Sequence, residues 1–238
     1  AGAKFIVSPG LNPEVVKYCV QRGIPVCPGT CTPSEVEQAL ALGLDAVKFF
    51  PAEPAGGLGF IKAMAAPYVG VKFMPTGGIS EKNSNEYLAF PKIHACGGSW
   101  MVKDALIKEG KFDEITRLTR EAVQKVLGFS LAHIGINSES EASALAIAEL
   151  FSKAFGFAVK NGNSSVFAGS AVEVMKEPYK GSCGHIAIQT NYIERAVNYM
   201  STVLGVEFEE PKRDEKGKYK ALYMKEEVGG FAIHLLQK

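Results

Sequence analysis

Short apolar runs alternate with helical segments through the first half of this chain, and this alternation is what most constrains the fold. Five runs have the length and composition of buried strands: residues 4–7, 24–27, 46–50, 71–74 and 93–96. Each run ends in a turn rich in glycine, proline, serine or threonine. Strands that alternate with helices predict a parallel sheet, and five successive units favour a β/α barrel.

Two of the segments between the runs begin with helix-start signals. Thr32-Pro33-Ser34-Glu35 has the pattern of a capping box, with proline at the first helical position. Asn12-Pro13-Glu14 is a similar start. These signals predict helices after the first two runs, as a succession of βα units requires.

Lys48 interrupts the third apolar run, within the string AVKFFPAE at residues 46–53. An ammonium held in apolar surroundings loses hydration, so its pKa falls and the neutral amine becomes a nucleophile. A neutral lysine attacks ketones to form a Schiff base, which then acts as an electron sink. A strand lysine can instead pack its stem and extend its head into solvent, so the run alone leaves both interpretations open.

Glycine-rich turns follow the last two runs, at residues 76–80 and 97–99. Glycine lets backbone N–H groups approach an anion closely, and a following helix N-terminus favours negative charge. Active sites of barrels lie at the carboxyl ends of the strands, where the last two loops frequently bind phosphate. The two turns therefore predict a phosphate site near Lys48, although taken singly such glycines merely permit tight turns.

Residues 1 to about 125 resemble the 2-keto-3-deoxy-6-phosphogluconate and 4-hydroxy-2-oxoglutarate aldolases, the KDPG/KHG aldolase family. The strings FIVSPG, VKFFPAE, FMPTGGI and GGSWMV carry the resemblance, in the family's order and spacing. By this resemblance Lys48 is the Schiff-base lysine and Phe50 lines the pyruvyl pocket. The residues that it implies for binding the substrate phosphate are Thr76, Gly77, Gly78, Gly97, Gly98 and Ser99.

The resemblance implies a lyase that acts in carbohydrate metabolism, in the Entner–Doudoroff pathway. Such a class I aldolase needs no cofactor and cleaves the keto-acid phosphate KDPG to pyruvate and glyceraldehyde 3-phosphate. Cleavage of 4-hydroxy-2-oxoglutarate, which has no phosphate, is the alternative reaction. The resemblance also implies a homo-oligomer, a trimer in the family.

The chain departs from this family at its beginning. A complete member has eight βα units, and this sequence opens at what corresponds to the fourth. The family's general acid–base glutamate and its carboxylate-binding arginine lie on earlier strands, so neither is assigned here. We expect the C-terminal portion of a (β/α)8 TIM barrel, with an exposed sheet edge and apolar interior. A non-catalytic module for small-ligand binding or assembly is the alternative.

The second half of the chain carries an internal repeat. LAHIGIN at residues 131–137 is echoed by CGHIAIQT at residues 183–190. The segments predicted to follow in the two copies are helices at 141–155 and 193–204, strands at 156–159 and 205–208, and closing strands at 171–176 and 231–237. Two such βαβββ copies resemble the vicinal-oxygen-chelate superfamily, or glyoxalase-like domains. We therefore predict a partial barrel at 1–128 and an α+β domain of two βαβββ modules at 129–238.

In glyoxalase-like domains the first and last strands of each module supply metal ligands. Here the resemblance places His133, Glu173, His185 and His234 at those positions. Imidazole and carboxylate groups suit zinc, nickel, manganese or iron(II), so a divalent metal in octahedral coordination is one interpretation. The other is that they are ordinary sheet residues, or part of a regulatory or oligomer-stabilising surface. His94 we predict to be a core residue without a role.

Charge and cysteine content limit the classes of partner. A net charge of +1 and a pI of about 7.8 give no reason to expect a nucleic acid or membrane partner. The five cysteines are odd in number and lie mostly in apolar runs, which suits reduced thiols in the cytoplasm. We therefore expect a cytoplasmic enzyme that acts on a small molecule.

Overall fold

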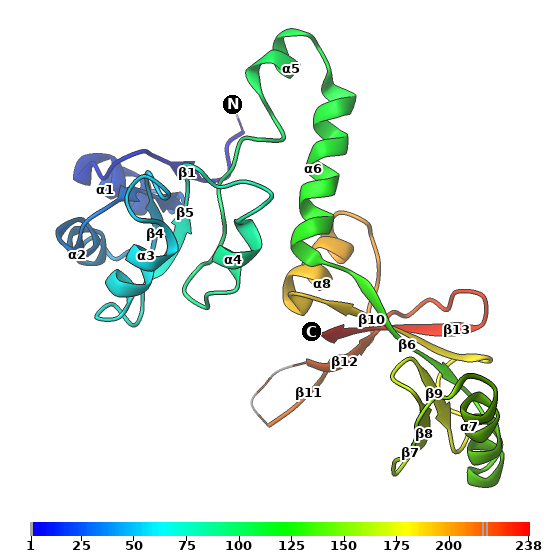
Figure 1. Cartoon of the computed structure of the whole chain (residues 1–238). Helices are drawn as coiled ribbons and strands as arrows, with labels where there is room; N and C mark the ends of the chain where they lie inside the picture. The colour runs from blue at the N-terminus through cyan, green and yellow to red at the C-terminus, as the bar shows by residue number, and fades with distance from the viewer. Residues whose placement is uncertain (1, 216, 218) are drawn as a thin grey trace. The chain divides into compact units, whose positions relative to one another are not determined.

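The computed structural model describes residues 2–215, 217 and 219–238. It divides the chain into two units, residues 1–122 and 123–238 (Figure 1). The division falls inside helix α6 (Phe112–Leu127), and the boundary that the sequence placed after residue 128 stays a prediction. Among the described residues, no helix combines the length and hydropathy needed to cross a membrane.

The first unit is built on parallel strands that follow chain order. Its strands are β1 (Ile6–Val7), β2 (Val26–Cys27), β3 (Gly29–Thr30), β4 (Ala46–Phe49) and β5 (Lys72–Pro75). β1 pairs with β2, and β3, β4 and β5 pair side by side. Pro28 separates β2 from β3, because proline has no N–H to donate to a ladder. Parallel strands in chain order with helices between them confirm the predicted TIM-barrel type of fold.

The prediction of a fifth strand at residues 93–96 was wrong in its extent. This run forms only isolated parallel bridges with the β5 region, between Phe73 and Ile93 and between Thr76 and Gly97. Thr76 is three residues beyond Phe73, whereas Gly97 is four residues beyond Ile93. One extra residue on one side interrupts the ladder, as in a β-bulge.

The helices of the first unit lie between or after its strands, and the first two begin where the capping signals predicted. They are α1 (Pro13–Gln21), α2 (Pro33–Ala41), α3 (Gly57–Ala65), α4 (Ser84–Leu88) and α5 (Asp104–Lys108). The Asn12 side chain accepts hydrogen bonds at the start of α1, and Thr32 and Glu35 form the complete capping box at the start of α2. Val16, Val36 and Ile61 are at most 1% exposed, so α1, α2 and α3 each bury one face.

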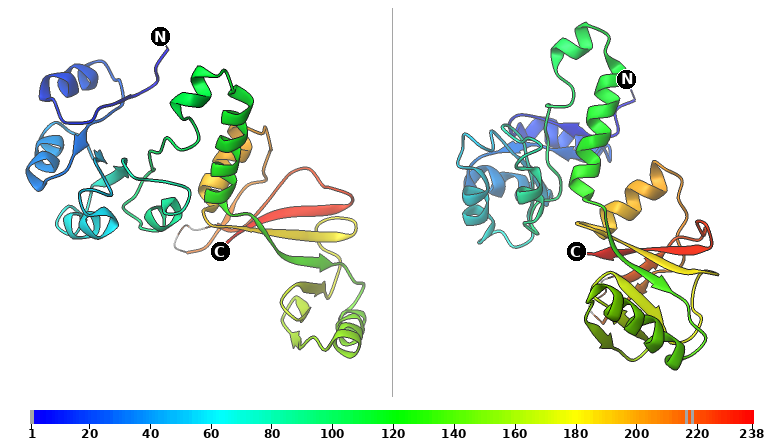
Figure 2. Two further views of the ribbon diagram at one scale, coloured as in Figure 1. Left: turned by 45° about the horizontal axis from the view of Figure 1, so that its top comes forward. Right: turned by 45° about the vertical axis from the view of Figure 1, so that its right-hand side comes forward.

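The second unit contains one eight-stranded sheet and two βαβββ copies (Figure 2). The first copy comprises β6 (Ser130–Ile136), α7 (Glu141–Phe155), β7 (Val159–Asn161), β8 (Ser165–Ala168) and β9 (Val172–Met175). The second comprises β10 (Gly184–Thr190), α8 (Ile193–Thr202), β11 (Lys212–Arg213), β12 (Tyr219–Tyr223) and β13 (Phe231–Gln237). The strand order β11-β12-β13-β10-β6-β9-β8-β7 relates the copies by a pseudo-twofold between β6 and β10. This topology confirms the predicted pair of modules.

Two of the strands predicted within the repeat differ from the structure. In the first copy, the strand expected at residues 156–159 begins only at Val159. In the second, residues 205–208 form no strand, and Phe208 makes an isolated bridge with Met224. The second copy has a longer irregular segment after its helix, so the repeat is less regular here than the sequence suggested.

Helices α7 and α8 pack on the same sheet from one side. On α7, Ala144 and Ala148 are fully buried against Val166 and Val174 of β8 and β9. A second core cluster joins α8 to β13 through Ile193, Ala196 and Leu235, with Leu127 beside them. Because side chains alternate along a strand, the residues between these core positions face the opposite side of the sheet. That side carries the four predicted metal ligands.

Leu235 tests this account of the core. Leu235 is 1% exposed, so Leu235→Ala should lower the free energy of unfolding by about 2–5 kcal/mol through lost burial and a cavity. Leu150 on α7 is the matched control, because it is 64% exposed and its change to alanine should cost within about 0.5 kcal/mol. Urea unfolding followed by circular dichroism measures both. Equal losses in the two variants would contradict the assigned core.

Candidate functional site

β4 holds Lys48 between two neighbouring strands. Lys48 is in register with Gly29 on β3 and Met74 on β5, and its N–H donates to the Pro28 carbonyl. The adjacent Phe49 is fully buried and stacks on Phe60 of α3, with ring centroids 5.8 Å apart. Because side chains alternate, Lys48 points to the other face of the sheet, away from α3. In a barrel that face is the interior.

Lys48 is buried and lies against Phe50. Only 8% of Lys48 is exposed, and its Nζ lies 4.4 Å from the centroid of the Phe50 ring. An ammonium over an aromatic face is attracted by the ring's quadrupole, so the ring restrains the amine. The structure thus brings together two residues that the sequence analysis selected. Their roles in binding and catalysis stay predictions.

The Thr76 turn lies at the same strand ends as Lys48. The Thr76 N–H donates to the Phe49 carbonyl at 3.0 Å, and its own carbonyl accepts from the Ala52 N–H at 2.8 Å. Gly77 and Gly78 have φ of +97° and +82°, a conformation that favours glycine. The turn therefore has the backbone shape that the two glycines predicted, directly beside the end of β4.

The two glycine turns contact each other. Thr76 and Gly97 form a parallel bridge, and a Cβ added to Gly97 would lie 2.5 Å from Thr76 Oγ1. Thr76 Oγ1 is itself buried and has no hydrogen-bond partner among the described residues. Gly98 and Ser99 are exposed at the end of the second turn. A buried hydroxyl without a partner beside an exposed glycine turn is a feature that a bound anion would satisfy.

Glu53 belongs to the same string as Lys48, and no role was predicted for it. The Glu53 N–H donates to the Gly77 carbonyl, and its carboxylate accepts a hydrogen bond from the Tyr87 hydroxyl. Burial, followed by the interaction with Glu53, raises the pKa of Tyr87, which therefore stays a neutral donor. Tyr87 thus holds Glu53, and Glu53 holds the first glycine turn. The position of Glu53 within that string was the available signal.

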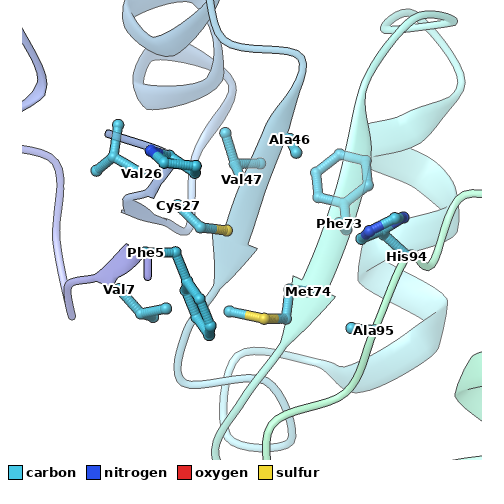
Figure 3. Close-up of a pocket in the computed structure, with 11 residues that line it drawn as sticks. Phe5, Val7, Val26, Cys27, Ala46, Val47, Phe73, Met74, His94 and Ala95 are labelled. Carbon is cyan, nitrogen blue, oxygen red and sulfur yellow. The ribbon is translucent and has the colours of Figure 1, made fainter. Parts of the chain in front are cut away.

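A separate apolar hollow of about 350 Å³ lies on the sheet of the first unit. Phe5, Cys27 and Met74 contribute side chains to it (Figure 3). His94 also lines the hollow and is exposed, so the prediction that it is a core residue was wrong. Lys48 and the glycine turns are not among its lining residues, but Met74, the register partner of Lys48 on β5, is one of them.

The four predicted metal ligands of the second unit meet on one face of its sheet. His133 Nε2 and His185 Nε2 are 3.2 Å apart, and each lies 3.1 Å from Glu173 Oε2. One ring nitrogen each from His133, His185 and His234 lie within 4.8 Å of one another. His185 and His234 are only 3% and 4% exposed. Residues more than 100 positions apart in sequence therefore form one buried polar cluster.

The electrostatics of the cluster favour metal-binding protonation states. Burial alone would raise the pKa of Glu173, but hydrogen bonds with His133, His185 and Ser165 outweigh it and hold that pKa far below its usual range. Burial, reinforced by His185 and His133, lowers the pKa of His234 to about 4. At neutral pH the site therefore offers a carboxylate and a neutral imidazole, the forms that bind metals.

The spacing of these groups fits a divalent transition metal. Ligand atoms about 2.0–2.1 Å from an ion lie roughly 2.8–3.4 Å apart, with neighbouring octahedral ligands at the lower end and tetrahedral ligands at the upper end. The separations of 3.1 and 3.2 Å among His133, His185 and Glu173 fall in that range. Among the described residues, both ring nitrogens of His234 are buried without a hydrogen-bond partner, a costly arrangement that an ion would relieve.

Two residues near the cluster were not selected by the sequence analysis. The Ser165 hydroxyl donates to Glu173 Oε1 at 2.6 Å, and the Tyr223 ring lies over His234 with centroids 4.7 Å apart. Burial, followed by the charges of Tyr179, Glu173 and Glu209, raises the pKa of Tyr223 to about 12. Both residues belong to strands next to the closing strands β9 and β13, and strand alternation was the available signal.

Comparison with known proteins shows what the first unit is similar to. Residues 1–118 match the family model described as KDPG and KHG aldolase. The 2-dehydro-3-deoxy-phosphogluconate aldolase of Treponema pallidum (strain Nichols) is 49% identical over 126 residues, which are 53% of this chain and 60% of the relative. The enzyme of the same name from Haemophilus influenzae (strain Rd) is 51% identical over 123 residues, 52% of this chain and 58% of the relative.

A solved structure of the KDPG aldolase from Legionella pneumophila, with pyruvate captured as a covalent carbinolamine, is 40% identical. It covers 51% of this chain and 59% of that chain, with a TM-score of 0.49. The chain spans 58–60% of the length of the two curated relatives described above. Over residues 1–118 this chain is therefore similar to the KDPG and KHG aldolase family.

Proposed function

We propose that the first unit carries out Schiff-base aldol cleavage of KDPG to pyruvate and glyceraldehyde 3-phosphate, with Lys48 as the nucleophile. The observation that carries this proposal is the placement of Lys48. Lys48 is 8% exposed, and its amine lies over the Phe50 ring. It also lies next to the end of β4, where the Thr76 N–H donates a hydrogen bond to the Phe49 carbonyl. The similarity to 2-dehydro-3-deoxy-phosphogluconate aldolases supports it.

The proposed reaction uses Lys48 as a covalent catalyst. The neutral Nζ attacks the keto carbon of the substrate, and loss of water forms the imine. Protonation of the imine nitrogen lets it accept the electron pair released when the bond between C3 and C4 breaks. The C4 hydroxyl loses its proton as the aldehyde product leaves, the enamine takes up a proton at C3, and water hydrolyses the resulting imine to pyruvate and free lysine. Phe50 would pack against the three-carbon pyruvyl part while it is bound.

We propose that the two glycine turns bind the phosphate of this substrate. Thr76 supplies a buried hydroxyl with no partner among the described residues. Gly77, Gly78, Gly97 and Gly98 allow backbone N–H groups to approach an anion, and Ser99 adds a hydroxyl at the exposed end. These features favour KDPG over 4-hydroxy-2-oxoglutarate, whose cleavage is the second candidate reaction. A homo-oligomer and a cytoplasmic location stay predictions.

Borohydride trapping tests the role of Lys48. We expect incubation with pyruvate and borohydride to add a pyruvate-derived mass to the peptide that contains Lys48. Lys48→Arg keeps the charge but cannot form the imine, so it should abolish the adduct and reduce kcat by at least about a thousandfold. Lys72→Arg is the matched control on the same sheet, because Lys72 is exposed. Trapping on another lysine, or unchanged trapping in Lys48→Arg, would contradict the assignment.

Ser99→Asp tests the phosphate site. A carboxylate at residue 99 should repel the substrate phosphate and raise KM for KDPG by at least about tenfold. The KM for 4-hydroxy-2-oxoglutarate should change little, because that substrate has no phosphate. Ser34→Asp adds the same charge at an exposed position at the start of α2 and is the control. An equal rise in KM for both substrates would count against phosphate binding by this turn.

We propose a second function for residues 129–238, the binding of a divalent transition metal by His133, Glu173, His185 and His234. The observation that favours it is the convergence of three imidazoles, with Glu173 Oε2 3.1 Å from two of them. Such an ion would supply Lewis-acid activation of a bound oxygen. The protein's own contribution is to hold the four ligands and to exclude water from them. A structural or regulatory surface is the competing interpretation.

Metal analysis of protein purified without chelator tests this proposal. We expect about one equivalent of zinc, nickel, manganese or iron, and we expect His185→Ala to lower metal affinity by at least about 100-fold. His94→Ala removes an exposed histidine of the first unit and should leave binding unchanged. If the parent takes up no metal, even after incubation with Co²⁺, the competing interpretation stands.

A further inference from the structure

Gly135 occupies the sheet position at which two of the proposed ligands meet. On β10 its register partner is His185, and on β9 its partner is Glu173. The two ligands therefore flank one glycine, and His185 Nε2 lies 3.1 Å from Glu173 Oε2. A side chain at residue 135 would stand between them.

The His185 ring fills the space that a side chain at residue 135 would need. A Cβ added to Gly135 would overlap the imidazole of His185, with Cε1, Nδ1 and Nε2 as its nearest atoms. Backbone conformation does not demand glycine here, because Gly135 is not among the glycines with positive φ. Gly135 is buried within β6. Glycine is therefore required at this position for space rather than for backbone freedom.

The second copy shows that this strand position accepts a larger residue. Ala187 is the equivalent of Gly135, two residues after the first histidine of its module. Ala187 is flanked by His133 on β6 and His234 on β13, so it lies between the other two proposed ligands. It is fully buried, and the register of β10 against β6 shifts directly after it. An alanine fits the fold here, and the His185 ring is what excludes it in the first copy.

Ser165 contacts Glu173, one of these two ligands, from the neighbouring strand. It lies on β8, is 6% exposed, and donates to Glu173 Oε1 at 2.6 Å. With Oε1 held by this hydrogen bond, Glu173 Oε2 faces His133 and His185 at 3.1 Å each. The serine thereby fixes which carboxylate oxygen is available to an ion.

We infer that Gly135 and Ser165 are positioning residues of the metal centre: Gly135 gives His185 room to reach Glu173, and Ser165 orients Glu173 toward His185. The expected effect of these two residues on metal binding rests on the second proposed function. The packing of Gly135 against His185 can be tested without metal. Partners of this kind around a metal site typically change metal affinity by about 10–100-fold when they are altered.

A double-mutant cycle tests the role of Gly135 in chelator-treated protein. Gly135→Ala should lower Tm in the parent, because the new methyl group collides with His185. In the His185→Ala background the ring is absent, so the same change should cost less than half as much. Full-size loss of Tm in both backgrounds, or failure to fold in both, would overturn the role of Gly135. Failure to fold in the parent together with folding in the His185→Ala background would support it.

Cobalt binding tests the role of Ser165. Ser165→Ala should weaken Co²⁺ affinity by about 10–100-fold and alter the visible spectrum of the bound ion, and Ser165→Thr, which keeps the hydroxyl, should restore both. Ser138→Ala is the matched control, because Ser138 is also 6% exposed and also donates a hydrogen bond of 2.6 Å, to the Met175 carbonyl. It should leave affinity and spectrum unchanged.

The outcomes distinguish the roles of Gly135 and Ser165 from the metal proposal on which they rest. Equal losses of affinity in Ser165→Ala and Ser138→Ala, or no loss in either, would overturn the role of Ser165. If the parent binds neither Co²⁺ nor zinc, the metal proposal fails and Ser165 loses its role with it. The double-mutant cycle still decides whether Gly135 makes room for His185, because that measurement contains no metal.

Discussion

Strand register places Lys48 and the four proposed metal ligands of this protein. In the first unit, Lys48 is in register with Gly29 and Met74, which directs its amine to the face opposite α3. In the second, His185 is in register with Gly135 across the pseudo-twofold. A slip of one residue in either sheet would turn these side chains to the other face, because side chains alternate with a period of two. Backbone pairing is therefore the constraint on which both sites depend.

The two sites differ in how many polar side chains they bring together. Lys48 enters an apolar run as one amine, and the Phe50 ring beneath it compensates part of its lost hydration. The second unit brings together three imidazoles and a carboxylate that are buried or half-buried, and both ring nitrogens of His234 lack a hydrogen-bond partner among the described residues. Such a cluster destabilises a fold unless a ligand satisfies it, which is why we propose a metal there.

Much of the fold was predictable from local chemistry. The capping residues Asn12 and Thr32 start helices as expected, and the repeat starting at residue 131 gives the two βαβββ copies. The predictions of strands were wrong where the local sequence pattern did not determine how strands pair. The run at residues 93–96 is apolar like the other strands, but one extra residue against β5 breaks its ladder. Propensity describes how one segment prefers to fold and carries no information about the spacing of its partner.

By itself, the sequence was enough to select the residues that we propose carry chemistry: the lysine in an apolar run, the paired glycine turns, and the histidines and glutamate of the repeat. Tertiary structure alone decided how they are supported. Glu53 ties the Gly77 turn to Tyr87, Ser165 holds Glu173, and Gly135 leaves room for the His185 ring. These contacts join residues on different strands or helices, so they depend on register and packing, which no single segment of sequence encodes.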